Sequence, residues 1–242
     1  MTLAITTAPI TTESQVGQLV AERPSRSRVF QGLGIDFCCG GKLSLAAACQ
    51  KKGLDAQTVV RMLQVNEDQA GGSAEVDAAA MTMTELCNHI ETTHHAYLRS
   101  ELPRLHQMLS KIAAVHGDHY PWTREVLAAF DPMMQEMGQH MMKEEQILFP
   151  LIRQLDAGQA CGTSHCGSIA NPIRMMEYEH DNAGAALAKF RQLTSDYTPP
   201  ADACNTFRAA LDGLAQLEAD MHQHVHKENN VLFPRALARE VQ

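Results

Sequence analysis

The sequence predicts an all-α protein, namely an antiparallel four-helix bundle preceded by a small helical N-terminal domain. Two observations support this fold class. Apolar residues recur at the spacing of one helix face through most of the chain. The composition is rich in residues that fill helix interfaces, with 13 Met and only 5% aromatics, and few segments favour strands.

The N-terminal domain is predicted to span residues 1–72. Apolar positions predict a helix over 13–22, and Ser44 and Asp55 are suitable N-caps for two further helices. The stretch QAGGSAEVD at 69–77 has the composition of a linker. A domain of this size is only marginally stable by itself.

The second domain is predicted to span residues 78–242 and to hold the bundle. Four long helical patterns follow one another, and their short connections favour antiparallel neighbours. Asn171 is the expected N-cap of the third pattern, and Pro132 is expected to kink the second. The patterns cover residues 84–115, 121–155, 171–195, and a last stretch from TPPADA to about Leu237.

Charge and hydropathy exclude several classes of function. The formal net charge is −8 and no basic stripe is present, so nucleic acid is not an expected partner. The chain has no long apolar run, and its first residues lack the pattern of an export signal. We therefore expect no membrane association and a cytoplasmic location. The seven cysteines are irregularly spaced, which favours reduced thiols over a disulfide framework.

An internal repeat indicates where the chemistry lies. HMMKEEQILFP begins at 140 and HVHKENNVLFP begins at 224, and both contain a His, a Glu four residues later, and Leu-Phe-Pro. The bundle is therefore expected to consist of two related helical hairpins. A further histidine precedes each segment at a matched distance, namely His95 before the first and His180 before the second.

This spacing predicts a site for two metal ions. Residues four apart lie on one helix face, so each repeated His and Glu can point together into the bundle core. Two buried carboxylates are costly without a counter-charge, whereas divalent metals neutralise them. Imidazole and carboxylate ligands favour iron, then manganese or zinc. The alternative is a duplicated bundle with these residues on its surface. The expected metal ligands are His95, His140, Glu144, His180, His224 and Glu228.

The repeated segments, together with HHAYLRSELPRL, MEYEHDNAG and GIDFCCGG, resemble the hemerythrin-like bundle and, more closely, the iron–sulfur cluster repair di-iron proteins, the "repair of iron centres" family. The resemblance covers nearly the whole chain. It implies two non-haem Fe ions in an oxo- or hydroxo-bridged di-iron centre, held by those six residues with both Glu bridging. It also implies repair of iron–sulfur clusters damaged by nitrosative or oxidative stress, with iron supply as the expected means. The implied partners are damaged iron–sulfur proteins as clients and nitric oxide or O₂ as small ligands, for a monomer or a homodimer.

One feature departs from the oxygen-carrying hemerythrins, which resemble this chain but have a fifth histidine on the third helix. The positions four residues from His180 are Met176 and Gly184, and neither is a ligand. Open metal positions favour binding of small ligands or release of metal over O₂ carriage. The polar segment at 157–169 looks like an insertion, which is either a loop or a labile extra metal site.

The adjacent cysteines Cys38 and Cys39 lie in the Gly-rich stretch GIDFCCGGK. A disulfide between neighbouring residues is strained, so the pair is poorly suited to form a stabilising disulfide. Backbone N–H groups and Lys42 are expected to lower a thiol pKa and so favour a reactive thiolate. The alternative is a pair of small buried residues. Our hypothesis is that Cys38 and Cys39 are catalytic, and that they receive or hand on iron or supply electrons near the di-iron site.

Five further residues flank the expected ligands. His94, His222 and His226 fall on other helix faces and are expected at the surface or behind the ligands. Glu136 and Glu179 are candidates for orienting a ligand imidazole or lining a channel.

Two other functions compete with cluster repair. The first is a nitric oxide reductase that detoxifies nitric oxide by making nitrous oxide. The second is a binding module that sequesters or senses nitric oxide or O₂. The missing fifth histidine argues against O₂ carriage, and catalytic formation of nitrous oxide would separate the enzyme from the other two functions.

Overall fold

The computed structural model describes residues 9–69, 77–159 and 168–240, and every regular element in these ranges is a helix. The predicted all-α fold class is therefore confirmed. Among the described residues, no helix combines the length and the apolar character that crossing a membrane requires.

The chain forms two compact units, and the boundary between them crosses the sequence more than once. Unit 1 comprises Met1–Thr82 and Val225–Arg235. Unit 2 comprises Met83–His224 and Ala236–Gln242. The last long helix of the chain therefore begins in unit 2, contributes a segment to unit 1, and ends in unit 2.

The N-terminal part of unit 1 forms four short helices, and two of them begin at the capping residues that the sequence predicts. Ser44 Oγ accepts a hydrogen bond from Ala47 N at 3.2 Å, and Asp55 Oδ2 accepts one from Thr58 N at 2.8 Å. Both side chains satisfy amides that a helix start would otherwise leave without a partner. The helices are α1 (Val16–Glu22), α2 (Arg26–Gly32), α3 (Leu45–Lys52) and α4 (Ala56–Gln69).

These four helices pack around one apolar cluster. Its central side chains are almost completely buried, and they include Val16, Phe30, Leu45 and Leu63. Full burial of one such side chain contributes about 1.5–3 kcal/mol. The cluster also includes Phe37, so the loop that carries the adjacent cysteines is anchored in the core of unit 1.

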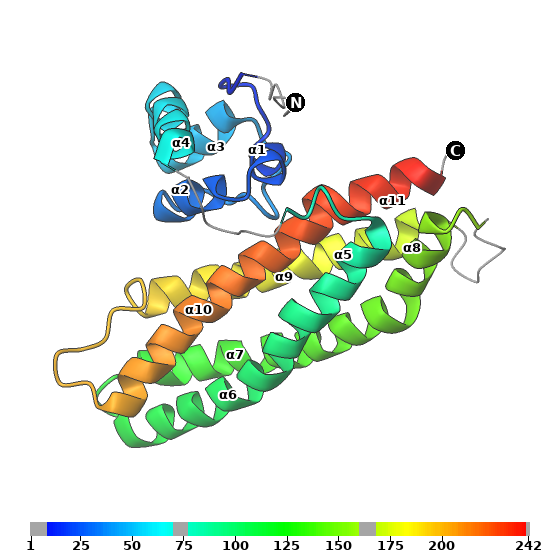
Figure 1. The fold of residues 1–242 in the computed structure, drawn as a ribbon. Coiled ribbons are helices and arrows are strands. Elements are labelled where there is room, and N and C mark those ends of the chain that lie inside the picture. Colours follow the sequence, from blue (N-terminus) through cyan, green and yellow to red (C-terminus); the bar gives the residue numbers. More distant parts are fainter. Residues whose placement is uncertain (1–8, 70–76, 160–167, 241–242) are drawn as a thin grey trace. The chain divides into compact units, whose positions relative to one another are not determined.

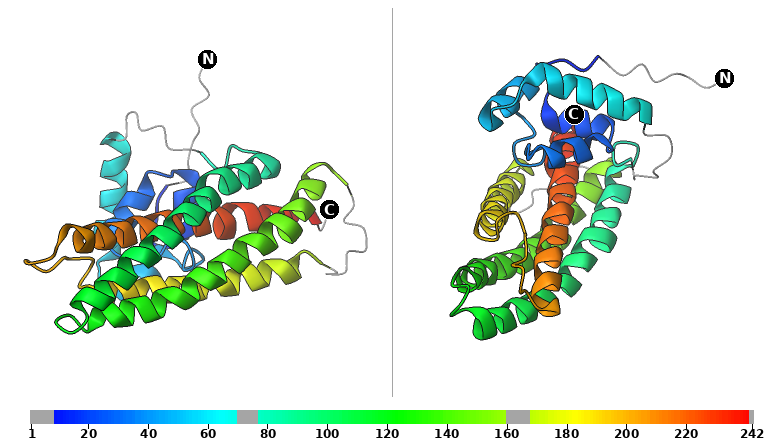
Figure 2. Two further views of the ribbon diagram at one scale, coloured as in Figure 1. Left: turned by 90° about the horizontal axis from the view of Figure 1, so that it is seen from below. Right: turned by 90° about the vertical axis from the view of Figure 1, so that its left-hand side faces the viewer.

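The elements of the bundle form four long helical rods. These rods lie side by side in Figures 1 and 2. The colours of Figure 1 show that each rod runs opposite to the one before it, as the short connections predict. Three rods contain a π-helical turn between two α-helical parts. The rods are α5 (Met83–Ile90) with η1 (Glu91–His95) and α6 (Ala96–His116), α7 (Trp122–Lys143) with η2 (Glu144–Leu148) and α8 (Phe149–Asp156), α9 (Ala170–Leu193), and α10 (Asn205–Lys227) with η3 (Glu228–Leu232) and α11 (Phe233–Glu240).

Aromatic side chains fill the interior of unit 2 away from the histidines. Phe130 and Phe190 are fully buried, and their ring centroids lie 6.0 Å apart. Nearer one end of the rods, the rings of Trp122 and Phe207 lie 5.4 Å apart. Aromatic pairs at such distances stabilise by about 0.5–1.5 kcal/mol beyond the area that they bury. This packing fixes the rods at a spacing that lets polar side chains from different helices meet.

The π-helical turns coincide with the expected metal ligands. η1 contains His95, η2 begins at Glu144, and η3 begins at Glu228. A π-helical turn closes its hydrogen bonds over five residues and is frequent at functional sites. The extra residue changes the direction in which the following side chains leave the helix. The regular helical spacing of the sequence did not predict these turns.

One detail of the expected helix starts is wrong. Asn171 is not the N-cap of α9, because the helix begins at Ala170 and Asn171 accepts a hydrogen bond from Arg174 within the first turn. Ser168 Oγ instead accepts the hydrogen bond of Ala170 N, at 3.1 Å. Ile169 occupies the N-cap position, so the serine that satisfies this amide lies one residue before the cap.

Two further expectations concern the bundle. Pro132 lies inside α7, which is helical on both sides of it, so the proline does not end the helix. The expected loop or extra metal site with Cys161, His165 and Cys166 lies outside the described residues.

Candidate metal centre

The structure brings together all six side chains that the repeat singled out. None of them is more than 1% exposed. Their donor atoms form two groups, and within each group the atoms lie within 4.8 Å of one another. The first group is His95, Glu144, His224 and Glu228, and the second is His140, Glu144, His180 and Glu228.

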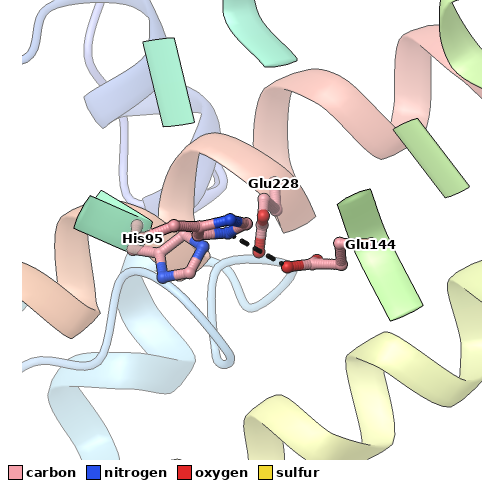
Figure 3. Close-up of side chains that lie close together, drawn as sticks. His95, Glu144 and Glu228 are labelled. Carbon is pink, nitrogen blue, oxygen red and sulfur yellow. Dashed lines mark ion pairs between the residues drawn. The ribbon is translucent and has the colours of Figure 1, made fainter. Parts of the chain in front are cut away.

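The two groups share both carboxylates. Glu144 Oε2 lies 3.3 Å from His95 Nε2 and also 3.3 Å from His140 Nε2, so it connects one group to the other. Figure 3 shows the carboxylates of Glu144 and Glu228 on the same side of the His95 ring. Each group takes one histidine from each helical hairpin. Neither hairpin can therefore complete a group without the other.

The histidines of the second group converge through their Nε2 atoms. His180 Nε2 lies 3.1 Å from His140 Nε2. Two nitrogen ligands about 2.1 Å from one metal, at a right angle, are about 3.0 Å apart. The observed spacing matches two ligands of one ion.

Carboxylates behind the ligands orient two of the histidines. Glu145 Oε1 accepts a hydrogen bond from His95 Nδ1 at 2.7 Å, and Glu179 Oε2 accepts one from His140 Nδ1 at 2.9 Å. A proton on Nδ1 leaves the Nε2 lone pair available for a metal, and such carboxylates are typical behind metal-bound histidines. Glu179 therefore lies where it can orient the His140 ring, as expected, whereas Glu136 is exposed.

Both outer carboxylates are held ionised. Burial opposes ionisation of Glu145, but hydrogen bonds from Arg99 and His95 outweigh it and lower its pKa below the ordinary value. The hydrogen bond from His140, together with one from Lys143, lowers the pKa of Glu179 to about 2. Two anions therefore lie behind the histidines, where they increase the basicity of the rings.

The neighbouring histidines are more buried than the sequence suggested. His94 is 3% exposed, hydrogen bonds through Nδ1 to Asp220 at 2.8 Å, and stacks on the ring of His224 with 5.3 Å between centroids. His226 is also buried, and desolvation lowers its pKa to about 4, whereas His222 is partly exposed. His94 therefore supports a ligand ring from behind. Glu145 and Asp220 were not among the sequence candidates, because their partners lie on other helices.

The chemistry of the donor set fits a pair of divalent metal ions. Two buried carboxylates and four imidazoles offer oxygen and nitrogen ligands without sulfur. Burying two carboxylates without cations costs many kcal/mol, and bridging by metals removes that cost. This ligand set suits iron, manganese or zinc.

The cysteine pair lies in the loop between α2 and α3, in unit 1. Cys38 is buried and Cys39 is partly buried, and neither is in a disulfide. The predicted lowering of a thiol pKa is wrong for Cys38. The hydrogen bond to Cys39 raises its pKa well above the ordinary value, and burial and the charge of Asp36 act in the same direction. The neighbouring groups thus favour a protonated Cys38, because they add negative charge instead of positive.

The segment Val225–Arg235, which belongs to unit 1, contacts the backbone of the cysteine loop. Asn230 Nδ2 donates hydrogen bonds to the carbonyl oxygens of Phe37 at 3.3 Å and Cys38 at 3.0 Å. Glycines make the approach possible: a Cβ at Gly17 would lie 2.1 Å from Asn230 Oδ1, and one at Gly41 would lie 2.3 Å from it. The two glycines therefore have a steric role that the sequence did not reveal.

Comparison with known proteins agrees with this architecture. Residues 86–236 match the family model described as the hemerythrin HHE cation binding domain, and residues 12–67 match a Domain of Unknown function (DUF542). The chain is 38% identical over 228 residues to the iron-sulfur cluster repair protein YtfE of Enterobacter sp., covering 94% of this chain and 98% of that protein.

Two other relatives have similar identity and coverage. The iron-sulfur cluster repair protein YtfE of Escherichia coli O157:H7 is 37% identical, with 94% of this chain and 98% of that protein covered. A probable iron-sulfur cluster repair protein of Haemophilus influenzae is 34% identical, with 93% and 97% covered. Both domains and nearly the full length are shared. The hemerythrin-like domain implies iron binding, and the buried His and Glu groups fit a metal site. The chain belongs to the family of iron–sulfur cluster repair proteins with a hemerythrin-like domain.

Proposed function

We propose that the protein repairs iron–sulfur clusters damaged by nitrosative or oxidative stress, and that it does so by supplying iron from a di-iron centre in the bundle. The observation that supports this most directly is the pair of ligand groups that share Glu144 and Glu228. Relatives of nearly the same length are named as cluster repair proteins. Damaged iron–sulfur proteins would be the clients.

In this proposal each group would hold one iron ion, and Glu144 and Glu228, which belong to both groups, would supply ligands to the pair. The centre supplies ferrous iron to a cluster that has lost it. This chain's own residues set the affinity for iron: Glu145 and Glu179 fix two histidines, and the buried surroundings keep water away. With only four histidines, the metal ions would keep open coordination positions, and nitric oxide is the small ligand expected there.

The domains have separate tasks in this proposal. Residues 78–242 hold the iron, and residues 1–72 carry Cys38 and Cys39, which take part in receiving or handing on iron. The thiols of Cys38, which is buried, and Cys39, which is partly buried, are hydrogen bonded to each other and provide ligands softer than those of the bundle. The transfer would therefore pass from nitrogen and oxygen ligands to sulfur ligands.

The test uses the full chain loaded with isotopically labelled iron. A purified hydro-lyase with a cluster damaged by nitric oxide is incubated with the loaded protein under anaerobic, reducing conditions. We expect the hydro-lyase to regain activity and to contain the label in its cluster. The matched control is the Glu228→Gln variant, which loses a bridging charge and should deliver little label.

Other outcomes would lead to different conclusions. Repair without transfer of label would contradict iron supply while leaving a repair role intact. Nitrous oxide formed over many turnovers from nitric oxide, with a supplied electron donor, would instead favour the reductase. Tight binding of nitric oxide with neither repair nor turnover would favour sequestration.

A further inference from the structure

A third group of convergent ligands lies in unit 1, apart from the six bundle residues. Asp36, Cys38 and Cys39 each offer one donor atom, and the three atoms lie within 4.8 Å of one another. We infer that Asp36, Cys38 and Cys39 form a three-ligand site for a thiophilic divalent cation such as Fe²⁺ or Zn²⁺. This inference rests on the role proposed above for the cysteine pair, and it adds Asp36 as a ligand.

The distances within this group match the edges of a metal coordination sphere. The two Sγ atoms lie 3.9 Å apart, and Asp36 Oδ1 lies 3.2 Å from Cys38 Sγ. Two thiolates about 2.3 Å from a tetrahedral metal are about 3.8 Å apart, and a thiolate and a carboxylate oxygen are about 3.5 Å apart. An ion can therefore bind all three atoms with only small side-chain movements.

The backbone keeps these ligands in position. Asp36 Oδ1 accepts a hydrogen bond from Cys38 N at 3.0 Å, and Oδ2 accepts one from Gly40 N at 2.9 Å. On the carbonyl side, Asn230 holds Phe37 and Cys38 as described above. A site whose backbone is fixed by both its amides and its carbonyls needs little ordering when an ion binds.

The charges of the group also favour a cation. When all three residues are ionised, three negative charges lie within a few ångströms, and they repel one another unless protons or a cation lie among them. A divalent ion displaces two thiol protons, which pass to solvent, and leaves a net charge of −1. Sulfur ligands favour softer metals than the bundle ligands do.

The site is accessible, which distinguishes it from the bundle. Asp36 is exposed, Cys39 is partly exposed, and only Cys38 is buried. Three ligands leave at least one tetrahedral position for water or for a ligand of another protein. A site of this kind suits exchange of a metal more than its permanent storage.

Cobalt is a suitable probe, because thiolate–cobalt charge-transfer bands appear in the near ultraviolet and the two His and Glu groups of the bundle contain no sulfur ligand. Co²⁺ is titrated anaerobically into the full, iron-loaded chain. Three other cysteines are first replaced by serine to remove competing thiolates, namely Cys161, Cys166 and Cys204. We expect about one cobalt per chain, with band intensity corresponding to two thiolate ligands.

Three variants in this background test the ligands. Cys38→Ser with Cys39→Ser should abolish the bands. Asp36→Asn removes the negative charge and keeps an acceptor for only one of the two backbone hydrogen bonds, and it should weaken cobalt binding by about tenfold or more. Asp55→Asn is the matched control, because Asp55 is another exposed aspartate that accepts backbone hydrogen bonds in unit 1, and it should leave binding unchanged.

Absence of the thiolate bands would overturn the inference, and so would an Asp36→Asn variant that binds cobalt as tightly as its parent. Circular dichroism and bundle iron content verify that each variant is folded. The test of this site can fail or succeed independently of the test of the proposed function. Repair without any thiolate–cobalt band would refute this site alone, whereas cobalt binding without cluster repair would refute the function and leave the site.

Discussion

The bundle and the cysteine loop collect their ligands in opposite ways. The bundle groups take six buried residues that lie between positions 95 and 228 in the sequence, from four helices. The loop group takes three residues between positions 36 and 39, and one of them is exposed. Ligands from distant positions meet only when the whole bundle has formed, whereas neighbouring ligands need only a local backbone conformation.

This difference indicates how firmly each group should hold a metal. The bundle ligands are hydrogen bonded from behind by Glu145 and Glu179, and they are closed off from solvent. The loop ligands are softer, fewer and accessible. We expect retention of metal in the bundle and exchange at the loop, and four sets of variants can break or sharpen this comparison.

The largest effect is expected from one of the two shared carboxylates. Glu144 belongs to both groups but His180 to only one. Glu144→Gln should therefore reduce the metal content from about two ions per chain to nearly none, whereas His180→Ala should retain about one. Elemental analysis of anaerobically purified protein measures both values. Equal losses in the two variants would contradict the sharing of Glu144.

A smaller effect is expected from the outer carboxylates. Glu179→Gln removes the anion behind His140, and Glu145→Gln removes the one behind His95, so each should weaken iron binding by about 10–100-fold. Competition with a chelator measures the affinity. Glu136→Gln is the matched control, because Glu136 is exposed on the same helix as His140. A similar loss in all three variants would exclude a specific effect.

The contact between Asn230 and the cysteine loop can be disturbed without replacing a ligand residue. Gly41→Ala places a Cβ 2.3 Å from Asn230 Oδ1 and 2.8 Å from the Phe37 carbonyl oxygen, so it should destabilise unit 1 by about 1–3 kcal/mol. At Gly32 a Cβ meets nothing within 4 Å, and Gly32→Ala should be neutral or stabilising by up to about 1 kcal/mol. Thermal unfolding compares the two, and equal melting temperatures would argue against close contact with Asn230.

The smallest effect is expected at a helix cap. Ser44→Ala removes the acceptor for Ala47 N and should lower the stability of unit 1 by about 1 kcal/mol. Amide exchange in α3 should become faster, while the metal content of the bundle stays the same. Ser44→Thr should restore most of the protection. A loss of bundle metal in Ser44→Ala would contradict the expectation that metal binding in the bundle does not depend on the stability of α3.

The sequence by itself determined the helical fold, two caps of unit 1, and the six bundle residues. It could do so because these features are local or repeated. A His and a Glu four residues apart share a helix face, and the second copy of the segment makes a chance occurrence improbable. Ser44 and Asp55 act on amides within three residues of themselves.

Only the tertiary structure decided how these residues combine. It pairs His95 with His224 and His140 with His180, so each group needs both hairpins. It also reveals the π-helical turns, the carboxylates that orient ligands on other helices, and the contact of Asn230 with the cysteine loop. Spacing along one helix gives the face on which a residue lies. Which neighbour that face meets depends on the packing of distant segments, and no local pattern records it.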